Sequence, residues 1–407
     1  MSNLRIDGDR LWSNLIETAR FGGTPDGGVR RLTLSEEDSQ VRLWLEERAE
    51  VMGCTVTRDR LGNMFIRRPG EHDGLKPIAM GSHLDTQPTG GKFDGILGVL
   101  AGLEVLQTLH DAGIATRHPL MLVNWTNEEG SRFAPAMLCS GAWAGVFSED
   151  YVLSREDAAG VSFGAALEAI FAAGEAAVGA QEFAAMFELH IEQGPVLERE
   201  GATIGVVTGV QGMRWYDLDL TGRAAHAGST PMDARADALL AAAGLIQSAA
   251  RLAQELGGYA TVGELTITDP SRNVVPGALR MSFDLRHRED SGLDAMEGGL
   301  KALIAALEGG ISADLRQIWA SPPVHFDTDC LASVREAAGA HGHRDIVSGA
   351  GHDAVYVARR APTAMIFVPC AGGLSHNPAE SATPADCAAG AQVLLDTVLL
   401  HDRKTAG

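Results

Sequence analysis

Apolar runs alternate with segments of apolar residues at helical spacing along the first part of the chain. The spacing predicts helices over residues 11–21, 35–52 and 95–112, and Gly113 ends the last of these. The continuous apolar runs predict strands at 78–80, 120–125 and 187–191, and a strand pair within 54–66 that turns at 59–63. An alanine-rich stretch at 154–185 is expected to be helical. Strands separated by helices indicate an open α/β sheet with its ligands at the carboxyl ends of the strands.

The pattern changes near residue 210. It predicts strands at 213–220, 261–268, 279–286 and 311–318, and amphipathic helices at 231–256 and 293–307, the first with Pro231 in its first turn. After Pro322 and Pro323 the α/β pattern resumes with a strand at 364–368. We therefore predict an α/β catalytic domain formed by residues 1–209 and 324–407, and an inserted α+β domain of two helices and four strands at 210–323.

Metal-binding side chains lie in segments at or near the ends of these strands. His83 follows the strand at 78–80, Glu128 and Glu129 follow the strand at 120–125, and His190 lies near the end of the strand at 187–191. Two more lie in glycine-bearing segments, Asp94 and His376. This mixture of nitrogen and oxygen donors suits zinc, manganese, cobalt or nickel better than calcium. Two such divalent ions, about 4 Å apart and sharing a carboxylate, would clamp a water and a scissile carbonyl. The set predicts a hydrolase with two transition-metal ions.

The neighbours of these residues strengthen that interpretation. The Asp85 side chain is placed to hydrogen-bond the ring of His83 and fix its tautomer. Asp94 lies between Gly91 and Gly95, whose backbone freedom would let its carboxylate reach two ions. Successive extended residues point in different directions, so one of the adjacent glutamates can bind metal while the other faces the attacking water. Each motif alone would be an ordinary polar loop; together they indicate a site.

Composition limits the class of protein and its partners. A chain of 407 residues favours two domains, and 45% hydrophobic with 21% charged residues is typical of a globular protein. A net charge of −20 argues against nucleic acid and anionic membranes as partners. No apolar run approaches the roughly 18 residues of a spanning helix. Residues 1–10 carry no apolar core of a secretory signal. Five scattered cysteines without a Cys-x-x-Cys pair fit reduced thiols, so we expect a cytoplasmic protein.

The order of these ligands resembles the M20 metallopeptidase-like superfamily, and within it the amidase/hydantoinase-carbamoylase branch. That branch includes N-carbamoyl-L-amino-acid hydrolases, β-ureidopropionases and allantoate amidohydrolases. The resemblance runs from about His83 to Asn377. Its motifs are Gly-Ser-His-Leu-Asp-Thr (81–86), Asn-Glu-Glu-Gly (127–130), His-Ile-Glu-Gln-Gly-Pro (190–195), Arg-Ala-Ala-His-Ala-Gly (223–228) and Ser-His-Asn-Pro (375–378). Peptidase branches commonly have a carboxylate where this chain has His190, and this difference favours the carbamoylase branch.

The resemblance implies a two-metal aminopeptidase-like catalytic domain with an inserted lid and dimerisation domain. One ion would be bound by His83 and His190 and the other by Glu129 and His376, with Asp94 bridging them and Glu128 as general base. The substrate would be a small ureido compound with a carboxylate, hydrolysed to an amino acid, ammonia and carbon dioxide when it is an N-carbamoyl-L-amino acid.

The resemblance also implies roles for four residues away from the metal ligands. Arg286 would bind the substrate carboxylate, with Asn273 at the same end and Gln193 at the carbamoyl end. The alternation of residues 279–286 puts Arg286 on the polar face of its strand, where a guanidinium can bind a carboxylate through two hydrogen bonds. His226 would stabilise the oxyanion in the neighbouring subunit of a homodimer.

The sequence is also compatible with other functions. Allantoate and N-carbamoyl-β-alanine fit the same clamp, and an aminoacylase or dipeptidase would use the same metals. Gly-Val-Ser-Phe-Gly (160–164) matches the nucleophile elbow of serine hydrolases, but no apolar strand precedes it. A binding protein without activity would require a missing ligand or base, and none is missing. His352 and Asp353, in a glycine-rich segment, either support the site or belong to a plain loop.

Overall fold

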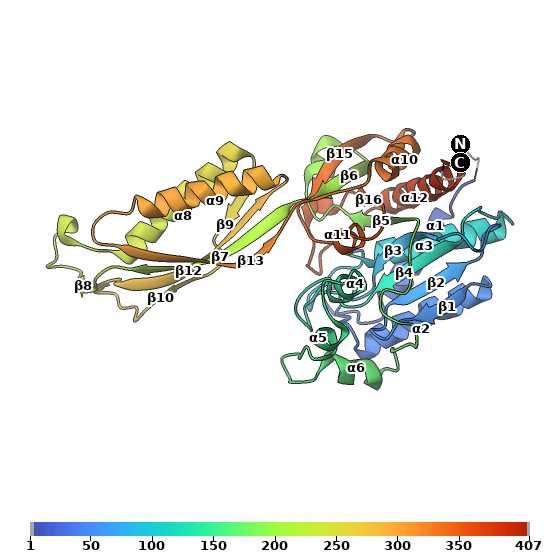
Figure 1. Ribbon diagram of the computed structural model, residues 1–407, viewed down its shortest axis with the longest axis horizontal. Helices are drawn as coiled ribbons and strands as arrows, with labels where there is room; N and C mark the ends of the chain where they lie inside the picture. Colours follow the sequence, from blue (N-terminus) through green and yellow to red (C-terminus); the bar gives the residue numbers. More distant parts are fainter. Residues whose placement is uncertain (1–3, 405–407) are drawn as a thin grey trace. The chain divides into compact units, whose positions relative to one another are not determined.

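The computed structural model describes residues 4–404 and divides them into two compact units (Figure 1). The larger unit comprises residues up to 208 and from 325 onward, and the inserted unit is Gly209–Val324. Both junctions lie one residue from the boundaries predicted from the sequence. Within the part of the chain that the structure describes, no helix is long and apolar enough to cross a membrane.

The larger unit is built on one mixed sheet. Its strands, within residues 4–404, follow the order β1-β2-β4-β3-β5-β16-β6-β14, with β15 paired to β6. β3, β4, β5 and β16 run parallel, and every residue in them is buried. This explains their continuous apolar sequences, since parallel strands are covered on both faces. The bounds are β1 Thr55–Arg58, β2 Met64–Arg68, β3 Ile78–His83, β4 Leu120–Trp125, β5 Ala185–Ile191, β6 Ile204–Val210, β14 Val324–His325, β15 His343–Ser348 and β16 Thr363–Val368.

Helices pack against this sheet, and α3 begins two residues after the predicted ligand Asp94. It is buried along nearly its whole length and contacts β3, β4 and β5, as well as α1 and α12. A Cβ at Gly98 of α3 would lie 2.3 Å from the carbonyl oxygen of Leu189, so helix and strand are in direct backbone contact. The helices of this unit are α1 Gly8–Thr18, α2 Glu36–Val51, α3 Ile96–Asp111, α4 Leu138–Trp143, α5 Glu149–Leu153, α6 Phe163–Ala169, α7 Val196–Glu200, α10 Thr328–Ala338, α11 Ala354–Val357, α12 Pro384–Lys404 and the short 3-10 helix η2 Ala371–Gly373.

The helix expected over 154–185 is wrong for most of its length. Only α6 is helical there, with Ser162 as its N-cap, and the following residues form a loop. A Cβ at Gly174 would lie 2.0 Å from the carbonyl oxygen of Arg58, so this loop packs closely against the end of β1. Alanine has the highest helix propensity of the amino acids, but propensity alone is a weak determinant of structure, and tertiary packing overrides it here.

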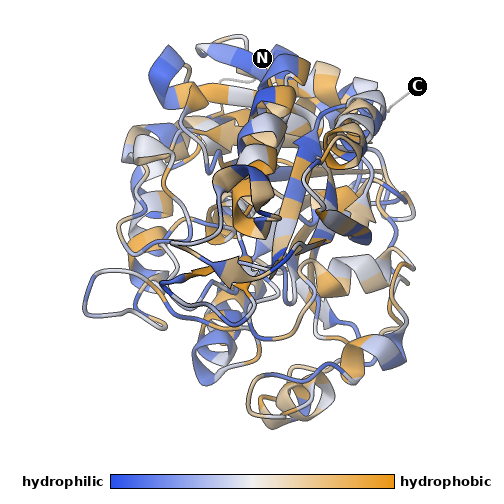
Figure 2. Ribbon diagram, turned by 90° about the vertical axis from the view of Figure 1, so that its left-hand side faces the viewer, coloured by the Kyte–Doolittle hydropathy of each residue, from blue (hydrophilic) through white to orange (hydrophobic). Residues whose placement is uncertain are grey.

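The inserted unit consists of an antiparallel sheet whose one face packs against two helices. The sheet order is β10-β12-β7-β13 with β9 paired to β12, and a separate two-stranded ribbon joins β8 and β11. Buried residues alternate along β7 and β12 and pack with the apolar sides of α8 and α9. Orange and blue segments accordingly alternate along the helices in Figure 2. The bounds are β7 Gly212–Thr221, β8 Ala225–His226, α8 Ala238–Leu256, β9 Tyr259–Thr261, β10 Leu265–Ile267, β11 Val274–Val275, β12 Ala278–His287, α9 Asp290–Ala305 and β13 Ser312–Ser321.

Two predictions for this unit need correction. The strand expected at 261–268 is two short strands, β9 and β10, so the sheet has five strands, and the ribbon was not predicted. The first long helix begins at Ala238 rather than at Pro231, because the side chain of Asp237 caps it by accepting from the N–H groups of Leu239 and Leu240. Pro231 instead precedes the short 3-10 helix η1, Met232–Ala234.

Candidate metal centre

The sheet of the larger unit brings the predicted ligands to one edge. His83 is the last residue of β3, His190 lies near the end of β5, and Glu128 and Glu129 follow β4. Because β3 pairs in parallel with both β4 and β5, their carboxyl ends meet at the same edge of the sheet. Asp94 lies just before α3, and the loop after η2 supplies His376.

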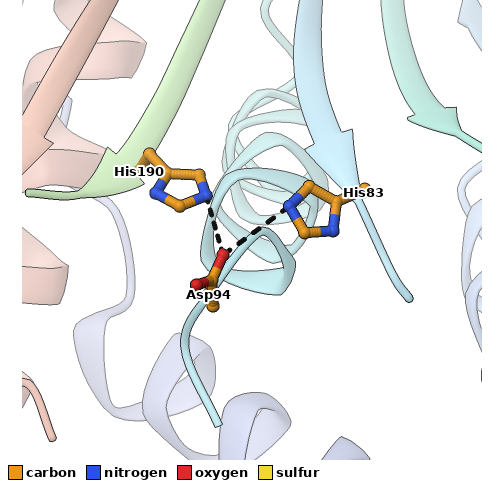
Figure 3. A group of neighbouring side chains, drawn as sticks. All are labelled: His83, Asp94 and His190. Atoms are coloured by element: carbon orange, nitrogen blue, oxygen red, sulfur yellow. Dashed lines mark ion pairs between the residues drawn. The ribbon is translucent and has the colours of Figure 1, made fainter. Parts of the chain in front are cut away.

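These residues form two groups that share Asp94. The first group consists of His83, Asp94 and His190, and the second of Asp94, Glu129 and His376. Within each group, the potential ligand atoms lie within 4.8 Å of one another. Asp94 Oδ1 is 3.7 Å from His83 Nε2 and 3.2 Å from His190 Nε2 (Figure 3). Its other oxygen, Oδ2, is 3.5 Å from His376 Nε2, which in turn is 3.4 Å from Glu129 Oε2. One carboxylate oxygen therefore faces each group, in the pairing that the resemblance implies.

The main chain fixes which nitrogen of His83 and His190 carries the proton. Nδ1 of His83 lies 2.9 Å from the carbonyl oxygen of Asp85, and Nδ1 of His190 lies 2.9 Å from that of Ile191. A carbonyl only accepts, so in each neutral ring Nδ1 donates and Nε2 keeps its lone pair. The N–H of Gly95, which donates to His190 Nε2 at 3.0 Å, agrees with this tautomer. Both lone pairs thus face the site.

The expected role of Asp85 is corrected by this geometry. Its main-chain carbonyl, rather than its carboxylate, holds the ring of His83; the carboxylate oxygen Oδ1 is 3.7 Å from Nδ1. The two carboxylate oxygens of Asp85 instead accept from the main-chain N–H groups of Glu128 and Glu129, at 3.2 and 3.3 Å. Asp85 therefore orients the glutamate pair.

Gly95 is required by this packing for two reasons. Its φ of +68° lies in the region that favours glycine. A Cβ there would also lie 2.2 Å from Cε1 of His83, so any side chain would displace the imidazole.

The charges of the site favour a cation. Burial, followed by repulsion from neighbouring carboxylates, raises the pKa of Glu128 and of Glu129 well above their usual range. Burial lowers the pKa of His83 to about 4. For His190, burial acts to lower the pKa and Asp94 to raise it, and the net value is about 9. A divalent cation would offset the repulsion between the carboxylates. It would also replace His190 as the positive partner of Asp94. The residues present fit metal ions in both groups.

Several supporting residues were not predicted from the sequence. Gln87 Nε2 donates to Glu129 Oε2 at 2.7 Å, and Glu188 on β5 accepts from Ser82 Oγ at 2.7 Å and from the N–H of Ala354 at 3.0 Å. Ser375 and Glu380 contact Asp94 or its main chain. The only sequence signal was adjacency, since Ser82 and Ser375 directly precede the predicted ligands His83 and His376.

The glycine-rich segment before α11 places one of its two candidate residues, His352, against the site. The ring of His352 is buried and contacts the ring of His190 edge-on, with centroids 4.6 Å apart. Asp353 is buried beside it and accepts from the hydroxyl of Ser140.

The remaining predicted residues lie in both units. Gln193, in the larger unit, donates to Asp94 Oδ2 at 2.7 Å. In the inserted unit, His226 on β8 is exposed, and its Nδ1 accepts from the N–H groups of Gly228 and Ser229. The carbonyl oxygen of Asn273 accepts from the N–H of Ala227, the residue after His226. Arg286 lies on β12, where it pairs with Asp284 at 2.8 Å.

The serine-hydrolase alternative is wrong. Ser162 caps α6 by accepting from the N–H of Ala165, and no strand directly precedes it.

The five cysteines are free and buried, and burial raises the pKa of Cys139 and Cys370, which argues against nucleophilic thiols.

Comparisons with known proteins agree with the geometry. Residues 79–400 match the family described as peptidase family M20/M25/M40. The chain is 46% identical to an N-carbamoyl-L-amino-acid amidohydrolase of Rhizobium meliloti, over 98% of this chain and 97% of that protein. It is 36% identical to an allantoate amidohydrolase of Bacillus subtilis, over 93% and 94%. A crystal structure of an amidase of the hydantoinase/carbamoylase family from Burkholderia multivorans superposes with a TM-score of 0.95 at 50% identity, covering 98% of this chain and 99% of that chain.

Proposed function

The chain belongs to peptidase family M20/M25/M40, and on that premise we propose that it hydrolyses the ureido C–N bond of an N-carbamoyl-L-amino acid. The products are the amino acid, ammonia and carbon dioxide. The observation that carries this proposal is the pair of ligand groups that share Asp94, with Glu128 beside them. The similarity to the Rhizobium meliloti amidohydrolase over nearly the whole chain supports the choice of substrate. Allantoate is the second candidate, because the Bacillus subtilis relative is an allantoate amidohydrolase.

Two divalent transition-metal ions, zinc, manganese, cobalt or nickel, are the proposed cofactors. His83 and His190 would hold one, Glu129 and His376 the other, and Asp94 would bridge them. Bound ions would polarise the ureido carbonyl and lower the pKa of a water molecule.

Glu128 is the proposed general base. Its Oε2 lies 3.6 Å from His83 Nε2, so the carboxylate is beside the ligand atoms without belonging to either ligand group. The main-chain N–H of Glu128 donates a hydrogen bond to the carboxylate of Asp85, and this bond fixes the main chain at Glu128. Glu128 accepts the proton of the attacking water and then delivers it to the nitrogen of the leaving group.

The remaining roles concern substrate binding and assembly. Arg286 and Asn273 bind the substrate carboxylate, and Gln193 contacts the carbamoyl end. His226 serves the neighbouring subunit of a homodimer, and its exposure supports such a role. The net charge of −20 favours a small-molecule substrate over nucleic acid or membrane partners, and the five free cysteines support a cytoplasmic location.

An ammonia-release panel tests this proposal. Protein reconstituted with zinc, manganese, cobalt or nickel is given N-carbamoyl-L- and D-amino acids, N-carbamoyl-β-alanine and allantoate. N-acyl-amino acids and dipeptides are followed by amine release. We expect turnover of N-carbamoyl-L-amino acids, its loss with a chelator and its recovery when metal is returned. Turnover of only the acyl or peptide substrates would show instead an aminoacylase or dipeptidase.

A further inference from the structure

A buried carboxylate outside both ligand groups connects the two loops that carry Asp94 and His376. Glu380 follows His376 in the same loop and is only 4% exposed. Its Oε1 accepts from the main-chain N–H groups of Phe93 and Asp94, at 2.9 and 3.1 Å. Burying a carboxylate costs free energy unless such hydrogen bonds compensate for the lost water. The main chain at Asp94 is therefore held by a side chain from the His376 loop.

The hydroxyl of Ser375 extends this connection to the side chain of Asp94. Ser375 Oγ lies 2.6 Å from Asp94 Oδ2 and 3.0 Å from Glu380 Oε2. Asp94 Oδ2 is the oxygen that faces His376. Both the main chain and the carboxylate of Asp94 are thus fixed to the loop that supplies His376.

The side chain of Glu380 packs directly against Gly91, and its main chain is bonded within its own loop. A Cβ at Gly91 would lie 2.1 Å from Cδ of Glu380, so the carboxyl group fills the space above this glycine. On its own loop, the N–H of Glu380 donates to the carbonyl oxygen of Asn377 at 3.0 Å. Directly before Asn377, the chain places His376 at a φ of +55°, which a non-glycine residue adopts only when its surroundings hold it.

The two ligand groups depend on this connection to different degrees. His83 and His190 belong to β3 and β5, and the hydrogen bonds of Glu188 to Ser82 and to Ala354 support them independently of Glu380. In the second group, both Asp94 and His376 come from the loops that Glu380 joins.

We propose that Glu380 is a positioning residue that sets the separation of Asp94 and His376, and thereby the affinity of the group Asp94, Glu129 and His376 for its metal ion. This inference rests on the proposed two-metal function. Removal of Glu380 lowers the affinity for the second ion and leaves the ion held by His83 and His190 in place.

The test is a zinc titration of metal-free protein by calorimetry, with metal content measured after dialysis against buffered zinc. In Glu380→Ala we expect the affinity of the second ion to fall about 10–100-fold, as is usual when a residue that orients a metal ligand is removed, while the first changes less than about threefold. Glu380→Gln keeps an oxygen for the N–H groups of Phe93 and Asp94 and should recover part of the loss. If Glu380→Ala does not fold, the Glu380→Gln titration decides: the affinity of the second ion should fall by a smaller factor, and the affinity of the first should not change.

Asp402→Asn is the matched control. Asp402 is also a buried carboxylate that accepts from two successive main-chain N–H groups, those of Arg117 and His118, and it belongs to neither ligand group. We expect Asp402→Asn to lower the melting temperature without changing zinc stoichiometry. Equal loss of both ions in the Glu380 variants, or unchanged affinities, would overturn the proposal. Wild-type protein that binds fewer than two zinc ions would refute the two-metal function itself, and ammonia release measures that function separately.

Discussion

Replacement of the proposed general base is the sharpest test of the mechanism. Glu128→Gln keeps the size of the side chain, and the bond from its main-chain N–H to Asp85 does not involve the substituted group. Glu128 is in neither ligand group, so the substitution leaves all five proposed ligands in place. An amide oxygen cannot take a proton from water at neutral pH, so only the proton transfer is lost.

The magnitude follows from the contribution of a positioned base. General acid–base catalysis contributes about 10²–10⁴-fold, which corresponds to about 3–5 kcal/mol of transition-state stabilisation. We expect kcat for ammonia release to fall by that factor, with KM within about threefold of the wild-type value and zinc content unchanged. The metal-free variant should be at least as stable as the wild type, because one of several mutually repelling buried carboxylates is removed.

Steady-state kinetics on the best ammonia-releasing substrate, with metal analysis of the same samples, measures these quantities. A fall in kcat of less than tenfold with full metal occupancy would refute the assignment of Glu128. A fall accompanied by loss of metal would show that Glu128 is a ligand.

The remaining predictions concern substrate binding, packing and pH. Arg286→Ala should raise KM at least tenfold for carboxylate-bearing substrates with a smaller effect on kcat, and unchanged kinetics would remove Arg286 from the site. Gly98→Ala should destabilise the larger unit by about 1–3 kcal/mol, because the new Cβ meets the carbonyl oxygen of Leu189 at 2.3 Å. Gly244 in α8 is exposed, and a Cβ added there would meet nothing within 4 Å, so Gly244→Ala should stabilise the inserted unit by about 0.5–1 kcal/mol in denaturant unfolding. A change in unfolding free energy of the same sign for both variants would contradict this reasoning. Burial raises the pKa of Asp59 to about 6, so its contribution to stability is fully present below about pH 4 and is lost as the pH rises through 6. The unfolding free energy of Asp59→Asn relative to wild type should therefore decrease as the pH falls from 7 to 5, and a pH-independent difference would show that Asp59 does not titrate in this range.

The proposed ligands could be located in the sequence because they follow features that local patterns encode. His83 and Glu128 come after continuous apolar runs, and such runs are typical of buried parallel strands whose carboxyl ends share an edge. The expected ligand pairing depended on the family resemblance, and the structure groups the residues in the same way.

Contacts between distant segments could not be predicted in the same way. Glu380 accepts a hydrogen bond from the N–H of Asp94, which is 286 residues away in the sequence, and a local hydrophobic pattern cannot predict such a contact. Local signals also failed where packing or capping decided the outcome. The alanine-rich stretch became mostly loop, because Gly174 packs against Arg58, and α8 begins where the carboxylate of Asp237 meets free N–H groups.

The carbonyl groups that hold the two buried imidazoles have a consequence for how this site tolerates change over evolution. Every amino acid carries a main-chain carbonyl, so no substitution at position 85 or 191 can delete the acceptor that keeps the proton on Nδ1 of His83 or His190. The orientation of the two imidazole rings is therefore determined by the path of the backbone. Selection can then use those two side chains for other purposes: Asp85 to hold the glutamate pair, and Ile191 to fill the core. Changes that bend the ends of β3 or β5 would reorient the rings, whatever side chains stand at positions 85 and 191.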